Sequence, residues 1–485
     1  MLSRRIPFAL LTLLLLDATV ASARQRAVRH PEPWPFTGAP ADVFSYAEPA
    51  KVTTRHLTLD LTVDFEAEQL RGRATLQIEN RPGNQMLVLD TYELGIESVL
   101  LDHSTPALWS LGDATPLGQP LRIAIEPSTR FVTIDYATEP SGDAMPNAFS
   151  SALTWTRDGT LYSFTVPIAS RSWMPVQDTP TVRMTYEATL RVPPGKLALM
   201  SAADNPQAIN DTGVYVFHMP YRIPAYLIGL AVGDFAFRPI DDRTGVYAAP
   251  AVLDGAARQL QSLPAMLDAA EDIAGPFPFA RHDLLVMPSG FVADGMEHPM
   301  LNFIHPKHVA DDPALQPQPR SLIAHELAHS WAGDATTLAA WNDVWLNEGF
   351  ATYLAHRIIE ELRGPELAEE AWRDEHESYR DYASRVPPST TILDREINHP
   401  TAAYSRTSYD KGALFLRALE EHTGRVRFDE FLRRYFAQLR WRWVDDRRFL
   451  ELFRAIARPD ETRLPLEEWL YQPGLPSDEA FDDAA

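Results

Sequence analysis

The stretch His325–Glu348, with the sequence HELAHSWAGDATTLAAWNDVWLNE, decides how the rest of the chain is interpreted. Its two histidines, His325 and His329, stand four positions apart, so both imidazoles leave one face of a helix and can bind one cation. Neutral imidazole is a preferred ligand of Zn²⁺, and a catalytic zinc keeps three protein ligands and one open position. Glu326 follows the first histidine, where the pattern H-E-x-x-H places a general base. The stretch therefore predicts a catalytic zinc site.

The third metal ligand is predicted to be Glu348. Eighteen residues separate it from His329, and it lies within WLNEGFATYLAHRI, a pattern typical of a second helix. Two histidines and a glutamate form one of the ligand sets that catalytic zinc uses. Because H-E-x-x-H is short enough to occur by chance, the alternative for each ligand is a polar side chain on a solvated helix face.

Two further segments match a known enzyme family. NEGFATYL contains the third ligand, and Gly295-Met296-Glu297-His298-Pro299 precedes the histidines. Together with HEXXH they resemble the M1 metallopeptidase family, which carries HEXXH, eighteen residues and Glu after a GXMEN segment. The resemblance is greatest to the leukotriene hydrolase and aminopeptidase B branch and extends from about Leu57 to Pro476. It implies an all-β, saddle-like N-terminal domain followed by a thermolysin-like, mainly α catalytic domain.

The resemblance also implies roles for residues near the metal. Glu297 is expected to pair with the free α-ammonium group of a peptide, and Gly295 and Met296 to present backbone groups to it. Tyr409, which precedes a D-K-G segment, matches the family tyrosine that donates a hydrogen bond to the oxyanion. Tyr404 is expected to line the substrate pocket.

Three positions depart from the family pattern. Val166 stands where relatives carry a glutamine that helps to hold the substrate amine, and His298 replaces the asparagine of GXMEN. Thr401 stands near where this branch places an aspartate, so we expect no strong preference for arginine or lysine substrates. We also expect the chain to lack the branch's C-terminal helical domain, and epoxide hydrolysis, known in one relative, is not carried over.

The composition is that of an ordinary folded protein. The 485 residues suffice for two or three domains, and 45% of them are hydrophobic and 23% charged. A net charge of −22 at pH 7 argues against a general nucleic-acid or anionic-membrane surface. The chain contains no cysteine, which excludes disulfides and a thiol nucleophile and leaves core burial and the metal to stabilise the fold.

Hydropathy patterns divide the chain into five segments. Residues 1–23 have the basic start, short apolar run and small final residues of a signal peptide, the alternative being an uncut membrane anchor. Residues 24–50 form a proline-rich lead-in, 51–235 alternate apolar and polar positions as β-strands do, and 236–476 hold the zinc motif among helical runs. Residues 477–485 form an acidic tail. We therefore expect an exported, periplasmic or secreted, bacterial protein.

Several runs in the second half of the chain have helical periodicity. We expect 253–274 to be one helix with a kink at Pro264, and Asn342 to cap the helix that carries the third ligand. The charged run 366–377 is expected to face solvent.

The sequence as a whole predicts a zinc-dependent aminopeptidase with one Zn²⁺ per chain. Glu326 would act as general base and Tyr409 as oxyanion donor while a metal-activated water attacks the N-terminal peptide bond. The expected partners are peptides with a free N-terminus; neither nucleic-acid binding nor stable membrane insertion after signal removal is expected. Two alternatives stay open. One is a thermolysin-type metallo-endopeptidase, against which Glu297 argues, and the other is a non-catalytic peptide-binding protein on a peptidase scaffold.

Overall fold

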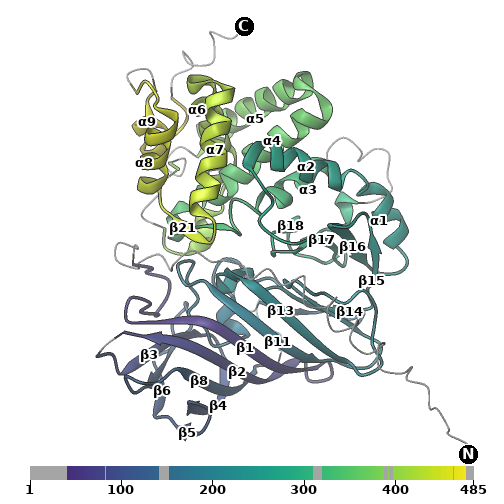
Figure 1. The fold of residues 1–485 in the computed structure, drawn as a ribbon, viewed down its shortest axis with the longest axis vertical. Helices are drawn as coiled ribbons and strands as arrows, with labels where there is room; N and C mark the ends of the chain where they lie inside the picture. Colours follow the sequence, from purple (N-terminus) through teal and green to yellow (C-terminus); the bar gives the residue numbers. More distant parts are fainter. Residues whose placement is uncertain are drawn as a thin grey trace, which may run out of the picture.

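The computed structural model of the protein describes residues 41–81, 83–140, 152–309, 319–386, 391–392, 397–461 and 464–476. The expected signal peptide, most of the proline-rich lead-in and the acidic tail lie outside these residues. Within the described ranges, no helix has the length and apolar character needed to cross a bilayer. A β-rich N-terminal half packs against a mainly helical C-terminal half (Figure 1), which is the fold class that the sequence predicts.

The largest sheet contains seven strands in the order β13-β11-β1-β2-β8-β4-β5. Strand β1 pairs parallel with β11 and antiparallel with β2. Along β1 the apolar residues Leu57, Leu59 and Leu61 are buried and the residues between them are exposed, so one face of the strand packs on the core. The strands are β1 (Val52–Asp64), β2 (Gln69–Asn80), β4 (Leu94–Leu101), β5 (Thr105–Pro106), β8 (Phe131–Thr138), β11 (Met184–Arg191) and β13 (Val214–Ile223).

Two smaller sheets complete the N-terminal half. One has the order β3-β7-β6 and the other the order β12-β14-β10-β9. Strand β10 leads directly into Phe164, Val166 and Pro167, which line the substrate cleft described below. The strands are β3 (Met86–Thr91), β6 (Trp109–Leu111), β7 (Gln119–Ala124), β9 (Leu153–Trp155), β10 (Leu161–Ser163), β12 (Leu197–Met200) and β14 (Leu230–Gly233).

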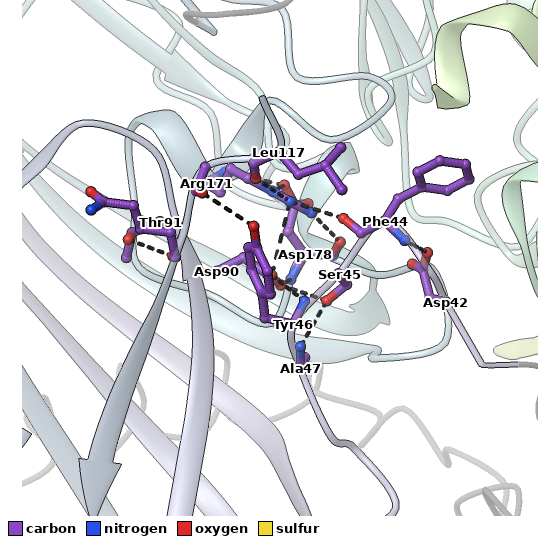
Figure 2. Close-up of polar contacts among 12 residues, drawn as sticks. Asp42, Phe44, Ser45, Tyr46, Ala47, Asp90, Thr91, Leu117, Arg171 and Asp178 are labelled. Atoms are coloured by element: carbon purple, nitrogen blue, oxygen red, sulfur yellow. Dashed lines mark hydrogen bonds and ion pairs between the residues drawn. The ribbon is translucent and has the colours of Figure 1, made fainter. Parts of the chain in front are cut away.

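The described end of the lead-in, residues 41–50, is held on the β-strands by a buried cluster around Arg171 (Figure 2). Asp90 accepts hydrogen bonds from a serine hydroxyl and a tyrosine amide within residues 44–46, at 2.6 and 2.7 Å. Arg171 donates to a carbonyl of the same segment at 2.9 Å and to the Asp178 carboxylate at 3.1 Å. Buried charges stay stable only when paired and hydrogen-bonded, so these contacts hold the segment and the loop after β10 together.

A five-stranded sheet of order β15-β16-β17-β19-β18 begins the C-terminal half. Strands β16, β17 and β19 run parallel, and β18 pairs antiparallel with β19 at the edge of the sheet. This edge strand carries Gly295 and Met296, the start of the GXMEN-like segment. The strands are β15 (Ala236–Pro239), β16 (Thr244–Ala248), β17 (His282–Val286), β18 (Gly295–Met296) and β19 (Leu301–Ile304).

The helices pack around α4, whose first four turns are almost wholly buried. A helix that is apolar on most of its faces belongs in a core, and here α2, α3, α5 and α6 all contact α4. A Cβ at Gly349 of α4 would lie 2.9 Å from the backbone of Gly412, so the absence of side chains lets two segments approach closely. The helices are α1 (Leu253–Gln259), α2 (Leu263–Ala274), α3 (Pro319–Ala328), α4 (Trp345–Arg363), α5 (Pro365–Arg385), α6 (Gly412–Thr423), α7 (Arg425–Leu439), α8 (Asp446–Ala457) and α9 (Leu466–Tyr471).

Two local expectations are wrong. Residues 253–274 form two helices rather than one, and Pro264 lies in the first turn of α2. Proline is well accommodated there because first-turn N–H groups have no partner within the helix. Asn342 lies in a short 3-10 turn ahead of α4, and Val344 is the N-cap residue of that helix. The parallel strand pair β20 (Thr336–Leu338) and β21 (Arg442–Val444) lies among these helices.

Candidate metal centre and substrate cleft

Three predicted metal ligands meet where α3 crosses the start of α4. The Nε2 atoms of His325 and His329 are 3.0 Å apart, and each lies 3.3 Å from Oε2 of Glu348. Ligand atoms about 2.0–2.1 Å from one tetrahedral zinc ion are about 3.3 Å from one another. The three donor atoms therefore have the spacing that a single Zn²⁺ requires.

Contacts behind the ligands orient the imidazoles. Nδ1 of His329 lies 2.9 Å from the carbonyl oxygen of Ala332, to which it donates when its Nε2 is free to bind metal. Nδ1 of His325 lies 3.3 Å from the hydroxyl of Thr352, one turn along α4 from Glu348. Both histidines thus direct Nε2 toward the third ligand.

The electrostatics of this cluster favour a cation. Although burial opposes ionisation, the two histidines lower the pKa of Glu348 to about 2, so its carboxylate is ionised. Burial also disfavours the charged form of His329, yet Glu348 and Glu297 raise the pKa of His329 well above its ordinary value. Burial lowers the pKa of His325. Three buried carboxyl groups, those of Glu297, Glu326 and Glu348, thus lie around the two histidines, and a divalent cation would compensate their charge.

Glu326 lies beside the ligands with an unsatisfied carboxylate. Its side chain lines the cleft, is only 4% exposed, and its Oε2 has no hydrogen-bond partner among the described residues. Burial raises the pKa of Glu326 well above the usual range. A Cβ at Gly295 would collide with Oε1 of Glu326, so the carboxyl rests directly against strand β18. The absence of a side chain at Gly295 thus makes the room that Glu326 occupies.

Glu297 lies close to both Glu326 and His329. Oxygen atoms of Glu297 and Glu326 and a nitrogen of His329 lie within 4.8 Å of one another. Burial raises the pKa of Glu297 against the attraction of His329. Met296, which precedes it, is buried and pairs with Phe303 in the sheet. The edge strand β18 therefore delivers a carboxyl group next to the metal ligands.

Tyr409 completes the group. It lies in the π-helical turn η9 (Thr407–Lys411), and its ring stacks on that of His325 with centroids 5.9 Å apart and an interplanar angle of 15°. Burial, the negative charges of the site and a hydrogen bond to Glu348 raise the pKa of Tyr409 well above its ordinary value. The phenol therefore stays protonated and available as a donor.

Of the other positions that the sequence singled out, three line the cleft and His298 does not. Tyr404, Thr401 and Val166 all line the cleft. His298 is wholly buried, with Nδ1 3.2 Å from the carbonyl oxygen of Leu227. Its ring centroid lies 4.7 Å from that of Phe303, and His298 is not among the residues that line the cleft. Because the ring fills the space that a side chain at residue 229 would need, His298 acts as a packing residue.

The cleft itself has a volume of about 1120 Å³ and extends well beyond the metal ligands. It includes Glu375, which the sequence placed in a solvent-facing charged run; this expectation is wrong for that residue. The Glu375 carboxylate lies 3.4 Å from Nε2 of His356, and both side chains are less than 20% exposed. Charged runs on amphipathic helices usually face water, and only the packing of α5 on α4 turns this residue inward.

Comparisons with known proteins agree with the geometry. Residues 259–468 match the model of the peptidase family M1 domain. The chain is 34% identical over 449 residues to leucine aminopeptidase 2 of Yarrowia lipolytica, with 88% of this chain and 68% of that protein covered. It is 31% identical over 463 residues to leukotriene A-4 hydrolase of Xenopus laevis, with 90% and 74% covered.

Solved structures show the same fold. Yeast LTA4 hydrolase in complex with bestatin superimposes with a TM-score of 0.82 at 29% identity, covering 93% of this chain and 72% of that one. An M1 zinc metallopeptidase from Deinococcus radiodurans superimposes with a TM-score of 0.74 at 23% identity, covering 90% and 99%. The fold and the metal centre define a zinc metallopeptidase that holds a single Zn²⁺. The chain belongs to peptidase family M1.

Proposed function

We propose that the M1 zinc aminopeptidase activity of this chain uses Glu326 as general base, Tyr409 as oxyanion donor and Glu297 as the group that binds the substrate amine. The observation that carries this proposal is the buried carboxylate of Glu326, whose Oε2 has no hydrogen-bond partner among the described residues, beside three metal-ligand atoms 3.0–3.3 Å apart. Buried polar atoms in native proteins nearly always have partners. A buried polar atom that lines a cleft and lacks a protein partner is expected to bind water or substrate instead.

His325, His329 and Glu348 would hold the zinc ion through the Nε2 atoms and Oε2. When bound, zinc acts as a Lewis acid that polarises the scissile carbonyl and makes a water acidic enough to attack near neutral pH. Glu326 accepts the proton of the attacking water and later delivers it to the nitrogen of the leaving amine. Tyr409 donates its phenolic proton in a hydrogen bond to the carbonyl oxygen as negative charge develops there.

Glu297 would restrict the reaction to chain ends. A carboxylate held beside the scissile bond pairs with the free α-ammonium of the first residue, and an internal peptide bond offers no such cation. Val166 stands where relatives carry a glutamine that helps to hold this amine, and valine offers it no polar group. Glu297 would therefore contribute a larger share of amine binding here than in those relatives. Glu297 is 6% exposed, which strengthens an ion pair made there because water is largely excluded.

Export is a separate part of the proposal. We propose that residues 1–23 direct the chain out of the bacterial cytoplasm and are then removed, because their composition is that of a signal peptide. N-terminal sequencing of the protein from its native cell should give a start near Arg24. A membrane-bound protein that still begins at Met1 would favour the anchor alternative.

The amine requirement provides the test of function. We expect hydrolysis of leucyl and alanyl anilides and no hydrolysis of the same peptides after N-acetylation. In Glu297→Gln, kcat/KM for free-amine substrates should fall by about 10²-fold, because a charge-assisted contact is replaced by a neutral one at an excluded-water site. Equal cleavage of blocked and free peptides by the wild type would instead assign the chain as an endopeptidase.

A further inference from the structure

The cleft extends along one face of helix α4. Glu348, Thr352, His356, Ile359 and Arg363 all line it, at spacings that keep side chains on the same side of a helix. Arg363 is the last residue of α4, fifteen residues after the metal ligand Glu348. At a rise of 1.5 Å per residue, the two Cα atoms are about 22 Å apart along the helix axis. The wall of the cleft therefore extends a peptide's length away from the metal.

Charge is distributed unevenly over this distance. Glu297, Glu326 and Glu348 gather at the metal end. Of the guanidinium groups that line the cleft, Arg406 is engaged with Asp410, 2.5 Å away. Arg363 is exposed and forms no ion pair with any described residue. The other carboxylates of the lining are paired: Asp294 with Lys307, Glu375 with His356 and Asp410 with Arg406. The cleft thus has three clustered carboxyl groups at the metal end and an available cation at Arg363.

We propose that Arg363 binds the C-terminal carboxylate of short peptides whose first residue lies at the metal. This inference rests on the function proposed above. A planar guanidinium pairs with a carboxylate through two parallel hydrogen bonds. The carboxyl groups at the metal end of the cleft would attract the N-terminal ammonium group of a peptide, and Arg363 would attract its C-terminal carboxylate. The peptide would therefore bind in one direction only. Arg363 is a specificity-determining residue in this account and takes no part in bond cleavage.

The distance sets the length of peptide that benefits. An extended chain spans about 3.3–3.6 Å per residue, so about six residues cover the 22 Å interval. Side chains on a helix lean toward its N-terminus, which brings the Arg363 guanidinium back toward the metal and shortens the interval. A carboxylate about four to six residues beyond the scissile bond is therefore within reach. Peptides of about five to seven residues should therefore bind more tightly through Arg363, whereas di- and tripeptides are too short to reach it.

The start of α5, which follows Arg363 directly in the chain, fits this assignment. Leu367 and Ala371 of α5 face the same cleft, and Leu367 is 50% exposed. With Ile359 of α4 they make the lining next to Arg363 mainly apolar, whereas the paired His356 and Glu375 line the cleft closer to the metal end of α4. Recognition at this end therefore depends mainly on Arg363.

The test compares a hexapeptide that carries a free C-terminal carboxylate with the same peptide as its C-terminal amide. In the wild type we expect KM for the acid to be about threefold to tenfold lower than for the amide, as one exposed charge-assisted contact provides. Arg363→Ala should remove the difference and Arg363→Glu should reverse it. High salt should reduce it in the wild type.

Three controls separate this inference from the proposed function. Hydrolysis of leucyl anilide and of a tripeptide should be the same in the wild type and in both Arg363 variants. Arg373→Ala, on the exposed face of α5 and outside the cleft lining, should behave as the wild type with every substrate. An acid-to-amide difference that is absent in the wild type, or that persists unchanged in Arg363→Ala, would overturn the carboxylate site while leaving the aminopeptidase intact. Absence of anilide hydrolysis in the wild type would instead refute the function on which it rests.

Discussion

The contact between Gly295 and Glu326 leads to a specific prediction about catalysis. In Gly295→Ala the added methyl would collide with Oε1 of Glu326, whereas real Cβ atoms essentially never approach another heavy atom within 3.0 Å. The carboxylate must therefore move by about 1 Å, and a misplacement of that size in a catalytic group costs on the order of 10²-fold in rate. The three heavy atoms nearest to the added methyl all belong to Glu326 and none to a metal ligand, so zinc content should be unchanged.

The assay is steady-state hydrolysis of leucyl anilide together with zinc content and melting temperature. We expect kcat to fall by about 10²-fold in Gly295→Ala while one zinc per chain remains. Gly290→Ala is the matched control, because a Cβ there has no heavy atom within 4 Å and Gly290 lies in the connection that leads from β17 to β18. Wild-type kcat in Gly295→Ala would refute the assignment of Glu326, in its observed position, as the base.

Further predictions concern the oxyanion donor, the packing of α4 and the lead-in. Tyr409→Phe should lower kcat about 10²- to 10³-fold with zinc content unchanged, and an unchanged kcat would remove Tyr409 from the mechanism. Gly349→Ala should lower the free energy of unfolding by about 1–3 kcal/mol, measured in urea, because its methyl would meet the backbone of Gly412. Burial raises the pKa of Asp178 to about 6 despite Arg171, so the folded state binds this proton more tightly than the unfolded chain does. Its stabilising contribution should be present below about pH 4 and lost as pH rises through about 6. The stability of the wild type relative to Asp178→Asn should accordingly fall over that interval, and a constant difference would contradict the assignment.

Much of the site follows from local sequence because its geometry is local. The spacing of His325 and His329 needs only one helical turn to bring two imidazoles together. The alternation of apolar residues along β1 is equally local, since each side chain's face follows from strand periodicity. The fold class was therefore predictable, and the structure and the relatives confirm it.

Features set by tertiary packing were not predictable in this way. The inward position of Glu375 and the cleft-lining position of Arg363 depend on how α5 packs on α4, and a charged residue on a helix carries no local signal of that. The buried position of His298 depends on the space left at residue 229, which lies in another strand connection. The π-helical turn at Tyr409 has no sequence signature, although it sets the direction of the phenol.

The most direct test of the account is one comparison of the wild type with Glu326→Gln, measuring zinc content and leucyl anilide hydrolysis on the same samples. We expect one zinc per chain in both proteins, because His325, His329 and Glu348 are untouched. We also expect hydrolysis to fall by about 10²-fold or more in the variant, since a positioned base contributes about 10²–10⁴-fold. A zinc-loaded Glu326→Gln enzyme with wild-type activity would contradict the central claim that Glu326 activates the attacking water.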